Sequence, residues 1–116
     1  MVKIENAIGT ISITDEVFTN LAGDAAARCF GVKGMAGRAK DGGVFALRRE
    51  SMSKGVTAVM GEDGSVSLEL HIVVDHGVNI CALCNSIMGE VSYKVEQATG
   101  VPVKNVDVYV DTMIID

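Results

Sequence analysis

The chain has 116 residues, of which 48% are hydrophobic, and its formal net charge at pH 7 is −5. This length fits one domain, because domains cluster around 100–150 residues and can bury roughly two thirds of their unfolded surface. The hydrophobic content excludes a disordered chain. The acidic balance argues against a general nucleic-acid binder, which needs a basic face for phosphates. We therefore expect one globular domain over residues 1–116.

The same composition predicts where the protein works. The first residues lack the basic segment and the apolar stretch of about 7–15 residues that an export signal needs. No apolar run approaches the roughly 18–20 residues that cross a bilayer. The three cysteines have no disulfide-framework spacing and suit a reducing compartment. We expect a cytoplasmic protein that reaches a membrane only through a partner.

The first predicted elements are a strand and a helix. Ile residues dominate residues 4–13, where Gly9 indicates a kink or bulge in one strand. Thr14 is the expected N-cap of the helix, because Asp15 and Glu16 then place negative charge in its first turn. The helix ends before Gly31 and carries one apolar stripe with spacings of three and four. The stripe comprises Val17, Phe18, Leu21, Ala22, Ala25, Ala26 and Cys29.

The middle of the chain has no clear period. Glycines interrupt residues 31–55, so residues 32–35 indicate a short strand and residues 44–49 either a helical turn or a mobile arm. Order returns at Val56, where two alternating runs flank the Asp63-Gly64 turn, which is a strong hairpin signal. The second of these runs, residues 66–75, presents one apolar face.

The last predicted elements are a helix and a strand. The helix begins around Asn79 or Ile80 and ends at Gly100, with Pro102 beyond it. Residues 106–111 alternate as a strand. The resulting order β-α-(β)-β-β-α-β predicts an α+β fold, with two helices on one face of a mainly antiparallel sheet of about four strands. The buried stripe of the second helix comprises Ile80, Leu83, Cys84, Ile87, Met88, Val91, Val95 and Ala98.

Short sequence blocks stand out along nearly the whole chain. They are residues 9–13 (GTISI), 31–35 (GVKGM), 53–56 (SKGV), 71–80 (HIVVDHGVNI), 99–100 (TG) and 106–110 (VDVYV). In this order they resemble the signature blocks of the alkaline shock protein 23 family, and GVNI at residues 77–80 is the most specific part. The resemblance implies a small cytoplasmic protein that serves cell-envelope homeostasis in Gram-positive bacteria, without known catalytic activity. It also implies self-association and, for some members, attachment to the membrane through an integral-membrane partner.

The chain departs from that family at the start of the second helix, where members often have a proline and an aliphatic residue. This sequence has Cys81 and Cys84 there instead, and a Cys-x-x-Cys at a helix N-terminus favours thiolate. A thioredoxin-like redox site would also need a first βαβ unit and a strand with a cis-proline close by. Zinc is the other chemical alternative, with Cys81 and Cys84 joined by His76, His71 or Cys29. Structural zinc needs four ligands and no second Cys or His pair is present, so packing is the default role.

The best binding candidate in the sequence is a basic segment. Residues 33–54 carry six of the ten basic residues against two acidic ones, a net +4 that leaves −9 for the remainder. Each Lys or Arg near an anionic surface is worth about 1 kcal/mol. The alternative is a solvated, glycine-rich loop. The partner-binding or anionic-surface residues would be Lys33, Arg38, Lys40, Arg48, Arg49 and Lys54.

Alternating strands at the ends of the chain supply a second candidate, because an exposed sheet edge can pair with another copy. The sequence thus predicts a non-enzymatic interaction protein that forms a homo-oligomer and binds a protein partner, such as an integral-membrane anchor, in the envelope stress response. It predicts no nucleic acid, no direct membrane span, no cofactor and no catalytic residue. The alternative is a thiol-redox or zinc-binding module at Cys81 and Cys84.

Overall fold

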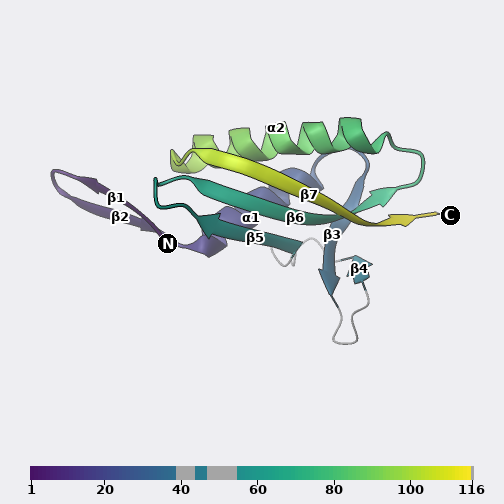
Figure 1. Ribbon diagram of the computed structural model, residues 1–116, viewed down its shortest axis with the longest axis horizontal. Helices are drawn as coiled ribbons and strands as arrows, with labels where there is room; N and C mark the ends of the chain where they lie inside the picture. Colours follow the sequence, from purple (N-terminus) through teal and green to yellow (C-terminus); the bar gives the residue numbers. More distant parts are fainter. Residues whose placement is uncertain (39–43, 47–54, 116) are drawn as a thin grey trace.

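The computed structural model describes residues 1–38, 44–46 and 55–115, with side-chain detail outside residues 35–54. Figure 1 shows the elements of these residues in chain order. They are β1 (Val2–Asn6), β2 (Gly9–Ile13), α1 (Asp15–Ala27), β3 (Val32–Arg38), β4 (Val44–Ala46), β5 (Val56–Met60), β6 (Val66–Asp75), α2 (Ile80–Thr99) and β7 (Val103–Ile114).

β6 is the central strand of the main sheet. Its N-terminal half pairs antiparallel with β5, and its C-terminal half pairs antiparallel with β3, which in turn pairs with β4. β7 pairs parallel along the whole of β6, from Val66↔Val103 to Asp75↔Ile114. Because β7 occupies one edge of β6, β3 and β5 share the other edge. The parallel pair needs a long connection, and α2 provides it.

Both helices cover the same face of this sheet (Figure 1). α1 contacts β3, β5 and β6, α2 contacts β7, and the two helices contact each other. The core lies between the helices and the sheet. This arrangement confirms the predicted α+β class, with two helices on one face of a mainly antiparallel sheet. Its fully buried members include Phe18, Ala22 and Ala26 of α1, Val66, Leu70, Ile72 and Val74 of β6, and Ile87, Val91 and Val95 of α2.

Local chemistry sets the ends of α2 where the sequence predicts them. The Asn79 side chain caps the first turn by accepting a hydrogen bond from the Ala82 N–H at 3.0 Å. Gly100 ends the helix with φ of 74°, a left-handed conformation that favours glycine. The predicted stripe is too broad at its margins, since Ile80 and Met88 remain 39% and 37% exposed and Ala98 is also exposed.

α1 is shorter than its apolar pattern. Thr14 is its N-cap, although the Thr14 side chain makes no capping hydrogen bond, and the helix ends at Ala27. Cys29 therefore lies beyond the helix, and Val17 at its start is 41% exposed. The interior of the stripe packs as expected, with Phe18 completely buried.

Residues 4–13 correct one prediction. They belong to two antiparallel strands, β1 and β2, whose pairs run from Val2↔Ile13 to Asn6↔Gly9, and not to one bulged strand. The Asn6 side-chain oxygen accepts hydrogen bonds from the backbone N–H groups of Ile8 at 3.0 Å and Gly9 at 3.1 Å. This local bonding closes a tight turn, as Asn commonly does. The β1–β2 hairpin projects along the long axis of the 56 × 31 × 22 Å molecule (Figure 1).

Candidate functional site

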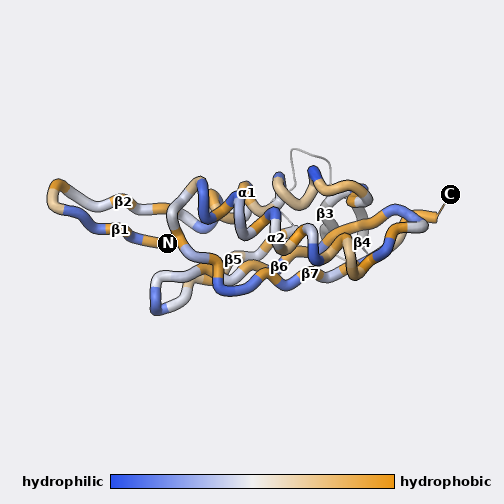
Figure 2. The backbone as a smooth tube through the Cα atoms, turned by 90° about the horizontal axis from the view of Figure 1, so that it is seen from above, coloured by the Kyte–Doolittle hydropathy of each residue, from blue (hydrophilic) through white to orange (hydrophobic). Residues whose placement is uncertain are grey.

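The β1–β2 hairpin carries an apolar face that begins in the core and continues into solvent. The cross-strand pairs Val2↔Ile13 and Ile4↔Ile11 place these four side chains on one face. Val2 is buried, and Ile4 and Ile13 pack partly against the core. Ile11, farther out, is 51% exposed, and Ile8 in the turn is 98% exposed. Figure 2 accordingly shows a hydrophobic turn at the far end of the hairpin.

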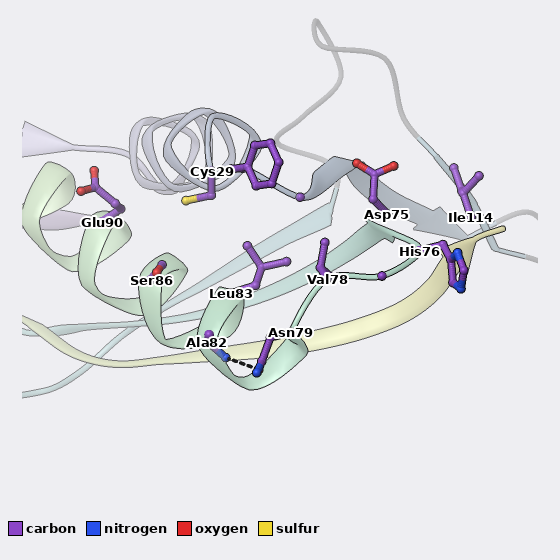
Figure 3. A pocket seen from close by; sticks show the side chains of 13 residues that line it. Cys29, Asp75, His76, Val78, Asn79, Ala82, Leu83, Ser86, Glu90 and Ile114 are labelled. Carbon is purple, nitrogen blue, oxygen red and sulfur yellow. Dashed lines mark hydrogen bonds between the residues drawn. The ribbon is translucent and has the colours of Figure 1, made fainter. Parts of the chain in front are cut away.

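A groove of about 920 Å³ lies at the other end of the long axis. Its walls are the segment after α1, the connection from β6 to α2, the first turns of α2 and the end of β7. Figure 3 shows Val78 and Leu83 pointing toward the space between the two helices, with Ser86 and Glu90 along α2. The groove therefore combines an apolar floor with a polar rim.

Gly31 lets the chain pass close to that floor. Its φ is +100°, and a Cβ atom added there would meet Cγ1 of Val78 at 2.9 Å. Because L side chains rarely adopt this φ and the neighbouring atom is so near, glycine is required at this position. The close approach of residues 29–31 to the β6–α2 connection defines one wall of the groove.

Two acidic residues face the groove from opposite ends. Glu90 lies on α2, and Asp75 ends β6. Burial, with a smaller contribution from Glu90, raises the pKa of the Cys29 thiol, so this lining residue is held in its neutral form. The side chain of Lys33 forms an ion pair with Asp75 at 3.2 Å.

The Lys33–Asp75 ion pair involves one residue of the basic segment predicted from the sequence. Lys33, on β3, is 46% exposed and already has an acidic neighbour within its own chain. Arg38 is the last residue of β3. Lys40, Arg48, Arg49 and Lys54 lie outside the described residues. The basic surface as a whole therefore stays a prediction.

The cysteine motif does not build a metal site in the part of the chain that the structure describes. Cys81 is exposed and Cys84 is half-buried. Burial, and secondarily Cys81, raises the pKa of the Cys84 thiol, the opposite of the shift that activates a nucleophilic cysteine. Within residues 1–38, 44–46 and 55–115, no three His, Cys, Asp or Glu side chains gather to hold a metal ion. His76 lines the groove, with neither cysteine of the motif beside it in the lining.

His71 occupies the solvent-facing side of the sheet, between the buried residues Leu70 and Ile72. Its Nδ1 lies 2.9 Å from Asp111 Oδ2 on β7, and its Nε2 lies 2.9 Å from Glu69 Oε1 on β6. The ring stacks on Tyr109 with centroids 4.7 Å apart. Both ring nitrogens are engaged, so His71 ties β6 to β7 and is not placed to join Cys81 and Cys84.

Sequence reasoning missed the hairpin and the groove. A signal for the hairpin was present, because Asn6 and Gly9 bracket a two-residue turn between Ile-containing runs. The groove had no comparable signal. Its lining comes from residues 29–31, residues 75–79, four positions of α2 (82, 83, 86 and 90) and residue 114, which only the folded sheet and helices bring together.

Comparison with known proteins places these features in a wider group. The model of the alkaline shock protein 23 family, described as having a cell envelope-related function, matches residues 3–115. The uncharacterized protein YloU of Bacillus subtilis is 34% identical over 111 residues, covering 94% of this chain and 92% of the relative. The uncharacterized protein Spy1614 of Streptococcus pyogenes is 33% identical over 114 residues, covering 97% and 93%. No solved structure is significantly similar.

The two helices can be compared with the length and apolar character that crossing a membrane requires. Among the residues that the structure describes, neither α1 nor α2 combines the length and apolar character of a bilayer-crossing helix.

Proposed function

Because the chain belongs to the alkaline shock protein 23 family, whose function is related to the cell envelope, we propose that it is a non-enzymatic interaction protein. It acts in cell-envelope homeostasis by associating with copies of itself and by binding a protein partner. The partner holds it on the cytoplasmic side of the membrane. The observation that carries this proposal is the exposed apolar face of the β1–β2 hairpin.

An isolated two-stranded hairpin is at best marginally stable in water, because one face lacks a partner layer. Here Ile8 and Ile11 extend beyond the layer that covers Val2. Burying one such side chain fully stabilises a contact by about 1.5–3 kcal/mol relative to leaving it in water. A second molecule that covers this face would supply the missing layer, which favours self-association through the hairpin.

Sedimentation velocity over a range of protein concentrations tests this proposal. We expect wild type to form species larger than the monomer as concentration rises, and Ile8→Glu to remain monomeric, because a carboxylate in the contact must lose its hydration. Ser12→Glu is the matched control, since Ser12 lies on the opposite face of the hairpin, across from Lys3. Monomeric wild type at every concentration would remove self-association from the proposed function.

Partner binding rests on a different observation, the net +4 of residues 33–54. Replacing Arg48 and Arg49 with Glu should weaken binding to anionic vesicles or to a partner captured from the native cell, because it reverses two charges of that segment. The unfolding midpoint serves as the control for an intact fold. Vesicle sedimentation that is unchanged by the double substitution, together with unchanged partner capture, would contradict a binding role for these arginines.

A further inference from the structure

We propose that the groove at the N-terminal end of α2 receives the hairpin turn of a second copy, so that copies associate head to tail. This inference rests on the proposed self-association and adds the surface that the hairpin contacts. The occupant is the turn around Ile8, together with Ile11 behind it. The receiving surface is the floor of Val78, Ala82 and Leu83.

The hairpin turn and the floor of the groove both present aliphatic side chains. The turn offers aliphatic side chains that are 98% exposed at Ile8 and 51% exposed at Ile11. The groove offers aliphatic side chains from α2 and the β6–α2 connection in a volume of about 920 Å³. Sites that bind compact ligands typically measure about 300–1,000 Å³ and are mostly apolar with a few polar groups.

Charge does not oppose this pairing. The chain carries a net −5, so two copies repel each other unless the surfaces that meet avoid like charges. Residues 6–14, which form the turn and all of β2, contain no charged side chain. They can approach Glu90 and the Lys33–Asp75 ion pair at the groove without adding a second negative charge.

Placement on the molecule determines what such a contact builds. The hairpin and the groove lie at opposite ends of the long axis, which spans 56 Å (Figure 1). A contact between two different surfaces leaves one hairpin and one groove free at the ends of each complex, so further copies can add. A symmetric contact between two hairpins would instead stop at a dimer. The expected product is an open chain or a ring.

The contact is small. A standard interface uses about 20–30 residues on each side, and a turn in a groove supplies fewer. A single contact is therefore weak, and the mean size of the assembly should grow gradually with protein concentration.

Sedimentation of two complementary variants tests the inference. Ile8→Glu blocks the hairpin, and Ala82→Glu blocks the groove. Ala82 is exposed and is the third residue after the Asn79 cap, where Glu suits a helix N-terminus, so the second variant should keep its fold. Asn85→Glu adds the same charge to an exposed position of α2 outside the groove lining and serves as its control.

We expect each blocked variant alone to remain monomeric, with its association at least tenfold weaker than that of wild type, and the Asn85→Glu control to assemble normally. Mixed in equal amounts, the two blocked variants should form a species of twice the monomer mass and no larger one. The intact groove of one copy then receives the intact hairpin of the other. If Ala82→Glu fails to fold, Ser86→Glu, another exposed lining position, replaces it in the same mixture.

Three results separate the possible failures. If the groove variants assemble like wild type while Ile8→Glu does not, the groove inference is overturned but self-association through the hairpin stands. A mixture that stays monomeric overturns the head-to-tail contact as well. If wild type itself never associates, the proposed function fails together with this inference.

Discussion

β6 and the β1–β2 hairpin use similar residues, but the apolar face of β6 is buried and that of the hairpin is partly exposed to solvent. In β6, Val66, Leu70 and Ile72 lie completely buried, because strands flank both edges and two helices cover the face. In the hairpin, exposure rises from 8% at Val2 to 98% at Ile8. An alternating pattern thus identifies an apolar face but not the surface that covers it. For β6 that surface belongs to the same chain, and for the hairpin we propose that it belongs to another copy.

Truncating one side chain in each region should give the largest contrast. Ile87→Ala in α2 should lower the free energy of unfolding by about 2–5 kcal/mol, because it leaves a cavity at a position with no exposed surface. Ile8→Ala should change that free energy by less than about 0.5 kcal/mol, because its side chain is already in water. Urea unfolding of dilute, monomeric protein measures both values. Similar losses for the two variants would show that the hairpin belongs to the cooperative core.

Two asparagines that bond to the backbone allow a finer comparison. Asn79→Ala should cost about 1 kcal/mol of stability, because it removes the cap of α2, while Asn79→Asp should retain most of it. Asn6→Ala removes two comparable bonds in the hairpin turn. It should speed amide hydrogen exchange in β1 and β2 and leave the global unfolding midpoint in place, since local opening does not require the core to unfold. A loss of global stability with Asn6→Ala as large as that with Asn79→Ala would contradict the separation of the two regions.

The smallest expected effect is a difference in thiol reactivity among the three cysteines, all of which lie outside the hairpin. Burial raises the pKa of Cys29 and of Cys84, so less of each is thiolate at neutral pH than in an ordinary thiol. Alkylation by iodoacetamide, followed by mass spectrometry, should label the exposed Cys81 first. Labelling of Cys29 and Cys84 should increase only as the pH rises toward their raised pKa values. Rapid, pH-independent labelling of Cys84 near neutrality would revive the thiol-redox alternative.

Sequence reasoning succeeded where the decisive interactions are local. Asn79 and Gly100 set the ends of α2 through their own side chain or backbone, and the alternation in residues 66–75 predicts β6 and its buried face. It failed for residues 4–13, where Gly9 suggested a bulge although the Asn6 side chain closes a turn. The groove could not be predicted, because its walls come from segments that only tertiary packing joins. Lys40, Arg48, Arg49 and Lys54 of the basic segment remain sequence predictions outside the described residues.

Amide hydrogen exchange at several protein concentrations tests the role of the hairpin most directly. If copies cover the hairpin, the amides of β1 and β2 should exchange more slowly as concentration rises, while those of β6, already protected by the core, should not change. In the Ile8→Glu variant, the exchange rates of the β1 and β2 amides should not change with protein concentration. Hairpin exchange rates that are the same in dilute and concentrated wild-type protein would contradict an intermolecular contact at this face.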